Sequence, residues 1–442
     1  MTGLALPTLL LGLLGAQAEA GEALLTRLAA IEALGTVSGV QVSLLEGGLP
    51  AGGFAHGFAQ LTPDGPVTLT RAHKVRVASI SKPFVAIAAM QLVEAEKLNL
   101  DGDVSEVLGW SLRNPAFPEV PITLRQLLSH TSSVRDADRY FIRNGEGRLR
   151  EFFEPETVLW ADGGHFASDQ PPGTYFAYSN LNFGVVATLL ERASGERFDR
   201  LMRNAVLAPL DVDGSFSACD VPRQLRAAGF RKRDAKEVWD PEGPWVAQVD
   251  GGEPACYYGG EPGDRLGRYA LGDNATLFSP QGGLRASADD LTRLLQVLLG
   301  RETALLSATT VAAMRSPQWA LDPSAANGLS SGEAPPGGDF DGFFQAFGLS
   351  VHLVDVSGWG LKSDIEQLIG HFGEAYGVLG FALADPVSGD GIAALITGTS
   401  RDPAVAASGS TPLYRIEEEI LRWWLEQRTT ATHASTGNDR VD

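Results

Sequence analysis

The sequence predicts an α+β fold in which strands from both ends of the chain form one antiparallel sheet and a mostly helical segment is inserted between them. Alternating apolar residues mark strands before residue 80 and again after residue 340. Between these strands, apolar residues recur at helical spacing. A closing helix with one apolar aromatic face follows the last strand.

The N-terminal strands follow a helical stretch at 19–31. The segment "VSGVQVSLLEGG", at 37–48, alternates apolar and polar side chains, and "AGGFAHGFAQL", at 51–61, follows it after a turn of glycine and proline. This pattern is typical of a β-hairpin. A third strand-like run, "HKVRVAS" at 73–79, leads into the first helix of the inserted segment.

Later elements follow in order along the chain. Helices are predicted at 83–98, 123–130, 181–194 and 287–299, strands at 347–354, 377–386 and 391–398, and the closing helix at 412–427. The stretch at 323–342 is rich in Gly, Ser and Pro and is predicted to be a long loop, whereas 213–278 reads as a loop-rich elaboration.

These elements predict a single domain over 19–428. Its sheet lobe combines 36–80 with 340–428, and its helical lobe covers 81–300. Residues 429–442, "TTATHASTGNDRVD", are expected to form a flexible tail.

Residues 1–18 are expected to be a signal peptide, because a short apolar run is followed by small residues and a cleavage-like site ending at Ala18. The run is too short to span a bilayer. It lacks a preceding positive charge, since the first basic residue is Arg27, but a core helix would be weakened by Pro7 and Gly12. We therefore expect a secreted or periplasmic protein without an integral membrane segment after cleavage, and a cytoplasmic one if the N-terminus is retained.

The charge of the chain excludes one class of partner. A formal net charge of −19 argues against nucleic acid, because phosphate binding needs a dense Lys/Arg surface. The expected partner is a small molecule or short peptide. No Cys/His spacing typical of a metal site is present, so neither a metal nor another cofactor is predicted. Cys219 and Cys256, the only cysteines, either form a disulfide in an oxidising compartment or remain buried free thiols.

Ser79 and Lys82 are the first candidates for chemistry. They lie three positions apart at the start of a helix, so they share one face. The apolar segment that follows would desolvate the amine and lower its pKa, as a general base requires. Pro83 fits only the first turn, which places the helix start near Ile80 or Ser81. The alternative is that a serine caps the helix and Lys82 reaches water.

Two further motifs follow in order. Tyr178-Ser179-Asn180 precedes a helix; a phenol beside a lysine can share its proton, and an asparagine amide can hold a carbonyl. Its alternative role is an aromatic anchor followed by an N-cap. His371-Phe372-Gly373 lies at the start of a strand, where glycine lets a substrate backbone approach the strand edge, although a lone strand histidine is usually structural.

Taken together, these motifs resemble those of the penicillin-recognising serine hydrolases, in the branch of class C β-lactamases, DD-carboxypeptidases and related esterases and D-aminopeptidases. The signatures Ser-x-x-Lys, Tyr-x-Asn and Lys/His-x-Gly match in the same order. The resemblance covers about 36–427 and implies the DD-peptidase/β-lactamase-like fold. It also implies a serine hydrolase working through an acyl-enzyme on an ester or a D-residue peptide.

The resemblance also implies a role for each matched residue. Ser79 would be the nucleophile, and Lys82 with Tyr178 would form the base network. Asn180 would position the acyl group, and His371 would lie near the substrate carboxylate or leaving group. The backbone N–H groups of Ser79 and Glu374 would form the oxyanion hole.

The third motif departs from that of class C β-lactamases, which carry Lys-Thr-Gly. His371 is mostly neutral at pH 7 where lysine is charged, and Phe372, expected beside Gly373 in the substrate site, lacks the threonine hydroxyl. This departure favours an esterase or peptidase. The alternatives are a β-lactamase of weak or narrow activity, or a penicillin or peptidoglycan sensor without turnover. The segment from His130 to Ser133 replaces the usual His-Thr-Ser-Gly and is expected to be a scaffold turn.

Overall fold

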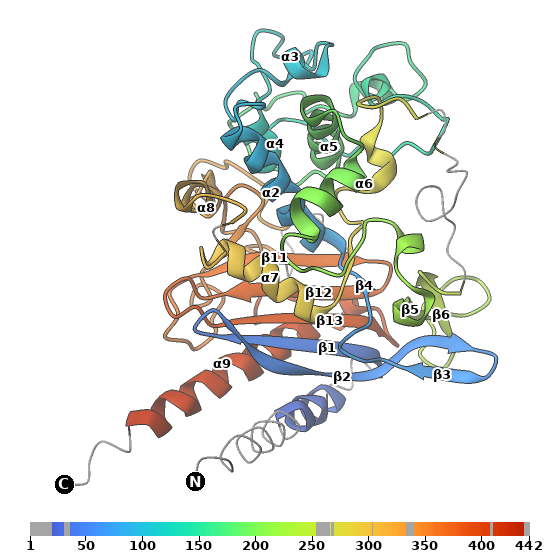
Figure 1. The fold of residues 1–442 in the computed structure, drawn as a ribbon, viewed down its shortest axis with the longest axis vertical. Helices are drawn as coiled ribbons and strands as arrows, with labels where there is room; N and C mark the ends of the chain where they lie inside the picture. The colour runs from blue at the N-terminus through green and yellow to red at the C-terminus, as the bar shows by residue number, and fades with distance from the viewer. Residues whose placement is uncertain are drawn as a thin grey trace, which may run out of the picture.

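The computed structural model describes residues 20–30, 36–252, 266, 269–302, 304–332, 340–406 and 410–436. Figure 1 shows one broad sheet with a helical lobe over one face and helix α9 on the other. Within the described ranges the sheet has nine antiparallel strands in the order β3-β2-β1-β13-β12-β11-β10-β9-β8. They are β1 (Val37–Glu46), β2 (Leu49–Thr62), β3 (Gly65–Thr68), β8 (Trp319–Ala320), β9 (Ala346–Phe347), β10 (His352–Val354), β11 (Leu368–Ala375), β12 (Val378–Ala384) and β13 (Gly391–Thr399).

The sheet joins both ends of the chain, as predicted, because β1 pairs with the hairpin strand β2 on one side and with β13 on the other. Gln41 and Ser43, the polar residues that alternate with apolar ones in β1, do not face water. Gln41 and Ser43 are buried and bond the start of α7, through Gln41 Oε1 to the N–H of Ala288 at 3.2 Å and Ser43 Oγ to Asp289 at 2.5 Å. Alternation therefore predicted the strand correctly, and its polar face is covered by a helix.

The third predicted strand, at 73–79, is wrong in extent. Only β4 (Val75–Arg76) is extended, and it pairs with β7 (Arg285–Ala286) away from the main sheet. The chain then turns at Ala78, whose φ of 48° lies in the left-handed region and cannot continue a strand. A further hairpin, β5 (Gly229–Lys232) and β6 (Trp245–Val249), lies in the loop-rich segment.

All four predicted helices of the inserted segment are present, as α2, α4, α5 and α7. The described helices are a stretch at 20–29, which was predicted at 19–31, and α2 (Ser81–Glu94), α3 (Val104–Leu108), α4 (Leu124–Leu128), α5 (Leu181–Ser194), α6 (Phe198–Leu201), α7 (Ala288–Leu298), α8 (Ala308–Met314) and α9 (Arg415–Thr436). The helical lobe was expected to continue to residue 300. Helix α7 instead packs on β1 and β13 and is part of the sheet lobe. Its first turn is fixed by a capping box between Ser287 and Asp290.

The two faces of the sheet have separate cores. One core joins the sheet to α2, α5 and α7. The other lies beneath α9, with Trp423 and Trp424 of α9 packed among residues of β11, β12 and β13. The closing helix runs past its predicted end at 427, through Thr436, because 428–436 contains no glycine or proline to stop it. The first part of the expected tail is therefore helical.

Several expectations fall outside the described ranges. Residues 1–18 and 437–442 lie there, as does Cys256. Cys219 is disulfide-bonded. Across the described ranges, no helix is long and apolar enough to cross a bilayer.

Candidate active site

The candidate nucleophile lies where the chain enters α2. Ser79 is in a 3₁₀ turn, Ala78–Ile80, and α2 begins at Ser81, which confirms the predicted helix start. Pro83 occupies the first turn of α2, where its missing N–H leaves no helical hydrogen bond unmade. The positive φ of Ala78 turns the backbone sharply just before the serine.

Neither serine at this junction caps the helix. The N-cap residue of α2 is Ile80, and it makes no side-chain cap hydrogen bond. Ser81 is buried, and its Oγ accepts the backbone N–H of Leu284 at 3.0 Å. The hydroxyl of Ser79 is therefore the one that remains for chemistry, and the capping alternative does not hold.

Lys82 is completely buried and bonds the nucleophile. Its Nζ lies 2.8 Å from Ser79 Oγ, 2.9 Å from Asn180 Oδ1 and 2.8 Å from the carbonyl oxygen of Gln281. An ammonium group can donate to all three acceptors. A neutral amine keeps two donors for Asn180 and Gln281 and can turn its lone pair to the serine hydroxyl, which is the arrangement of a general base. The alternative in which Lys82 reaches water is wrong.

Tyr178 lies beside the same amine. Lys82 Nζ is 4.7 Å from the centroid of its ring, within range of a cation–π interaction. Two aromatic rings stack on the phenol: His130 lies at 4.3 Å between centroids and Phe344 at 5.4 Å. The ring of Tyr178 thus lies beside the amine, and the base role expected of its hydroxyl stays a prediction.

The turn that carries Asn180 is held by an aspartate that sequence reasoning missed. Asp136 accepts hydrogen bonds from Ser179 Oγ at 2.8 Å, from the N–H and the side-chain amide of Asn180 at 2.9 Å each, and from the N–H of Leu181 at 2.8 Å. These bonds turn the amide oxygen of Asn180 toward Lys82. Asp136 lies three residues beyond the His130–Ser133 turn that was expected to be scaffold, and no motif marked it in the sequence.

His371 does not reach the substrate space. It is 1% exposed, packs against His352 at 4.5 Å between centroids, and donates from Nδ1 to the carbonyl oxygen of Phe372 at 2.6 Å. Burial, together with the positive charge of Lys82, lowers its pKa to about 3. The imidazole is therefore neutral at pH 7, as predicted, and lies behind the site next to Tyr178.

The strand β11 brings its backbone, and not all its side chains, to the nucleophile. A Cβ on Gly373 would lie 2.6 Å from the carbonyl oxygen of Val77 and 3.2 Å from the nitrogen of Ser79, so only glycine allows this approach. Strand β10 pairs with β11 only as far as Gly370. Beyond it, the strand edge at Gly373 and Glu374 lies next to Ser79, as the oxyanion-hole assignment requires.

Phe372 points the other way. Its side chain is 5% exposed and packs in the core beneath α9, with ring centroids 5.8 Å from Phe381 and 6.0 Å from Trp359. Successive strand residues face opposite sides of a sheet, so Gly373 on one face puts Phe372 on the other. The structure does not bring Phe372 to the substrate site, contrary to the expectation from sequence.

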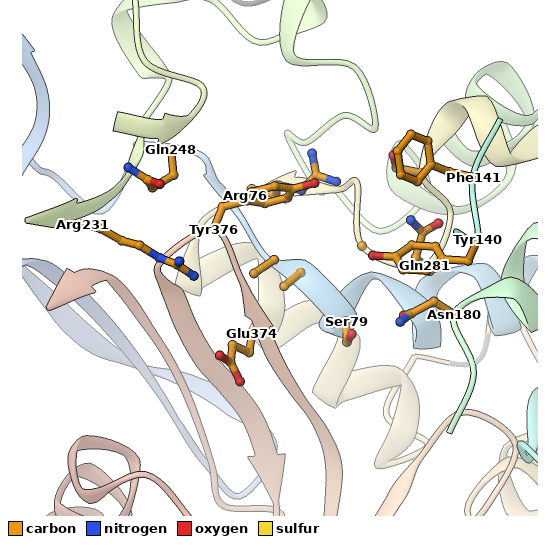
Figure 2. A pocket seen from close by; sticks show the side chains of 14 residues that line it. Arg76, Ser79, Tyr140, Phe141, Asn180, Arg231, Gln248, Gln281, Glu374 and Tyr376 are labelled. Atoms are coloured by element: carbon orange, nitrogen blue, oxygen red, sulfur yellow. The ribbon is translucent and has the colours of Figure 1, made fainter. Parts of the chain in front are cut away.

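A cavity of about 450 Å³ opens over Ser79. In Figure 2, Tyr140, Phe141, Asn180 and Gln281 lie on one side of the serine, and Arg231, Gln248 and Glu374 lie on the other, with Arg76 and Tyr376 above. The side with Asn180 is aromatic and amide-rich, whereas the opposite side is charged. The nucleophile lies between two chemically different walls.

Comparisons with known proteins place the chain in one family and one fold. A family model described as Beta-lactamase matches residues 28–409. Penicillin-binding protein 4 of Amycolatopsis lactamdurans is 27% identical over 163 residues, or 37% of this chain and 41% of that protein. The chain thus matches less than half of that relative's length.

Two solved structures share the architecture over nearly the whole chain. One is EstCE1, described as a hydrolase with promiscuous acyltransferase activity, with a TM-score of 0.61 and 21% identity over 90% of this chain and 99% of that one. The other is the D-amino acid amidase from Ochrobactrum anthropi SV3 complexed with L-phenylalanine amide, with a TM-score of 0.63 and 17% identity over 94% and 99%. At these identities the likeness shows a shared fold and does not carry the neighbours' substrates to this chain.

Proposed function

The chain belongs to the β-lactamase family of penicillin-recognising serine hydrolases, and we propose that it hydrolyses an ester or a D-residue peptide through an acyl-enzyme on Ser79. The observation that carries this proposal is the contact of 2.8 Å between the buried amine of Lys82 and Ser79 Oγ. A buried lysine bonded to a hydroxyl at the floor of a cavity is the arrangement of an activated nucleophile.

The reaction proceeds in two steps. Ser79 Oγ attacks the substrate carbonyl carbon as its proton passes to the neutral amine of Lys82, and the N–H groups of Ser79 and Glu374 hold the oxyanion. The bond to the leaving group then breaks, and the leaving group takes that proton. Water next gives a proton to the same amine and attacks the acyl carbon. The acid is released as Ser79 Oγ regains the proton.

The third motif supports ester or peptide hydrolysis over β-lactamase activity. The imidazole of His371 is neutral and buried behind Tyr178, so it offers no charge to a β-lactam carboxylate. Phe372, in the place of the family threonine, faces the opposite core. Neither side chain of this motif can therefore serve a β-lactam as Lys-Thr-Gly does.

The test is covalent labelling. The parent protein and its Ser79→Ala variant would be incubated with a fluorophosphonate and, separately, with a penicillin, and the mass followed against time. We expect a fluorophosphonate adduct on the parent alone; its absence would overturn the nucleophile assignment. A penicillin adduct that persists would identify a sensor, and one that clears with product would identify a β-lactamase.

Ser81→Ala is the matched control. This neighbouring serine is buried and bonds the backbone of Leu284, so its loss should leave the adduct in place. Short-chain esters, D-alanyl peptides and a chromogenic cephalosporin would then rank the substrates of the parent protein.

Export from the cytoplasm is proposed as well. The disulfide at Cys219 suits an oxidising compartment, in agreement with the apolar N-terminal run. Protein recovered from its host should begin after Ala18, as measured by intact mass. An N-terminus at Met1 would contradict the proposal.

A further inference from the structure

The charged wall of the cavity raises the question of what ligand it fits. The third motif supplies no cation there, because His371 is neutral and buried. Lys82, for its part, is committed to three acceptors beneath the serine. Among the described residues that line the cavity, the cationic side chains are Arg76 and Arg231.

Arg231 is held at the cavity wall by its strand. It lies on β5, half-buried, with its guanidinium carbon 5.2 Å from the ring centroid of Trp239. Its Nε is buried and has no hydrogen-bond partner among the described residues. The next residue, Lys232, bonds the carbonyl oxygen of Pro241 at 2.9 Å. Arg231 is therefore a cation fixed at the cavity wall, and its guanidinium group can still donate hydrogen bonds to a ligand.

Arg76 reinforces the positive charge on the same side. Its guanidinium carbon lies 5.0 Å from the ring centroid of Tyr376, which also lines the cavity. The wall has one carboxylate, Glu374, and that group accepts a hydrogen bond from the hydroxyl of Tyr414 at 2.7 Å. Two guanidinium groups against one carboxylate give the described lining a net positive charge; the buried Asp250, which also interacts with Arg76, is paired with Arg285.

We propose that Arg231, with Arg76 beside it, binds a carboxylate on the part of the substrate that lies across Ser79 from Asn180. A guanidinium fork matches a carboxylate in shape and charge. Because Asn180 is assigned to the acyl group, this carboxylate belongs to the leaving part. The inference rests on the proposed function, because it names the residues that determine which esters and amides are hydrolysed. It also places the anion site on β4 and β5 instead of at the third motif.

Two matched esters test the proposal. 3-Acetoxybenzoate and 3-acetoxybenzamide transfer the same acetyl group and differ only in the charge of the leaving phenol. The quantity measured is the ratio of their kcat/KM values. Since a charge-assisted hydrogen bond contributes about 10- to 100-fold in affinity, Arg231→Gln should lower this ratio by about that factor. Arg231→Lys should restore part of it.

Lys232→Gln is the matched control. It removes one positive charge from the same strand but not from the cavity wall, so the ratio should stay at the parent value. An equal loss in the Lys232 and Arg231 variants would show a long-range charge effect and overturn the assignment. So would an unchanged ratio in both Arg231→Gln and Arg76→Gln.

A binding measurement separates this inference from the proposed function. Titration calorimetry on the Ser79→Ala protein would compare 3-hydroxybenzoate with 3-hydroxybenzamide, with and without Arg231→Gln. Preference for the benzoate that needs Arg231 would support the carboxylate site even if the parent protein hydrolysed neither ester. Hydrolysis that depends on Ser79, without any benzoate preference, would keep the proposed function and reject the site.

Discussion

Asp136 accepts two hydrogen bonds from Asn180, one from its backbone N–H and one from its side-chain amide, each at 2.9 Å. The side-chain bond fixes which way the amide faces, because a carboxylate can only accept and the amide must therefore turn its NH₂ group to Asp136. The amide oxygen is thereby left for Lys82. A residue outside the three motifs thus sets the geometry of the buried amine.

Asp136→Ala should lower the rate of fluorophosphonate labelling by about 10²-fold, because misplacing a catalytic group by about 1 Å has effects of this size. The exposed Asp138, two residues on, provides the control as Asp138→Ala. Thermal melting of both variants would be measured beside the labelling rate. If the Asp136 variant, while still folded, labelled as fast as the parent, Asp136 would have no part in positioning Asn180.

The two buried lysines allow catalysis and stability to be separated. Lys82→Met keeps the bulk of the side chain and removes the amine from Ser79, so kcat/KM should fall by about 10²- to 10⁴-fold. Lys74→Met removes a second buried lysine, whose Nζ lies 2.7 Å from Asp290. Breaking that buried ion pair should cost about 3–5 kcal/mol of the free energy of unfolding.

Ester hydrolysis and urea unfolding would be measured for both lysine variants, to separate the effect on catalysis from the effect on stability. The expected result is an inactive but folded Lys82 variant and an active but destabilised Lys74 variant. If Lys82→Met kept most of the parent kcat/KM, the amine would not be the base.

Much of this site could be predicted from sequence because its signals are local. The start of α2 follows from Pro83, and the pair of Ser79 and Lys82 follows from helical spacing. The sheet joining both chain ends follows from the period of its apolar residues. Each of these inferences needs only a few neighbouring positions.

The remainder depends on contacts between distant segments. Asp136 meets Asn180 across 44 positions, and no spacing in the sequence marks that pair. Arg231 reaches the cavity from a loop-rich segment that seemed an elaboration. Phe372 was expected in the substrate site because its neighbours are there, but strand alternation sends it to the opposite face.

The buried histidines should make stability depend on pH. The pKa of His371 is lowered to about 3 in the folded protein by burial and by Lys82, whereas an unfolded histidine has a pKa near 6.5. Between these values the unfolded chain binds the extra proton. The contribution of the neutral His371 to the free energy of unfolding is therefore fully present above about pH 6.5. It is lost as pH falls toward 3, at up to about 1.4 kcal/mol per pH unit.

His371→Gln should reduce the slope of unfolding free energy against pH by up to that amount between about pH 6 and 4. Urea unfolding at several pH values measures it. Burial also lowers the pKa of His352, so His352→Gln should act in the same direction. Slopes equal to that of the parent in both variants would show that these imidazoles are not neutral in the folded state.

Restoring the family threonine should not create a β-lactamase. Because Phe372 packs beneath α9, Phe372→Thr would leave a cavity and bury a hydroxyl, at a cost of about 3 kcal/mol or more. Turnover of a chromogenic cephalosporin should not rise. Phe141→Thr is the matched change at an aromatic residue that is 39% exposed and lines the substrate cavity, so it should alter KM with little loss of stability. A stable Phe372→Thr variant that gained cephalosporin turnover would place this side chain in the substrate site after all.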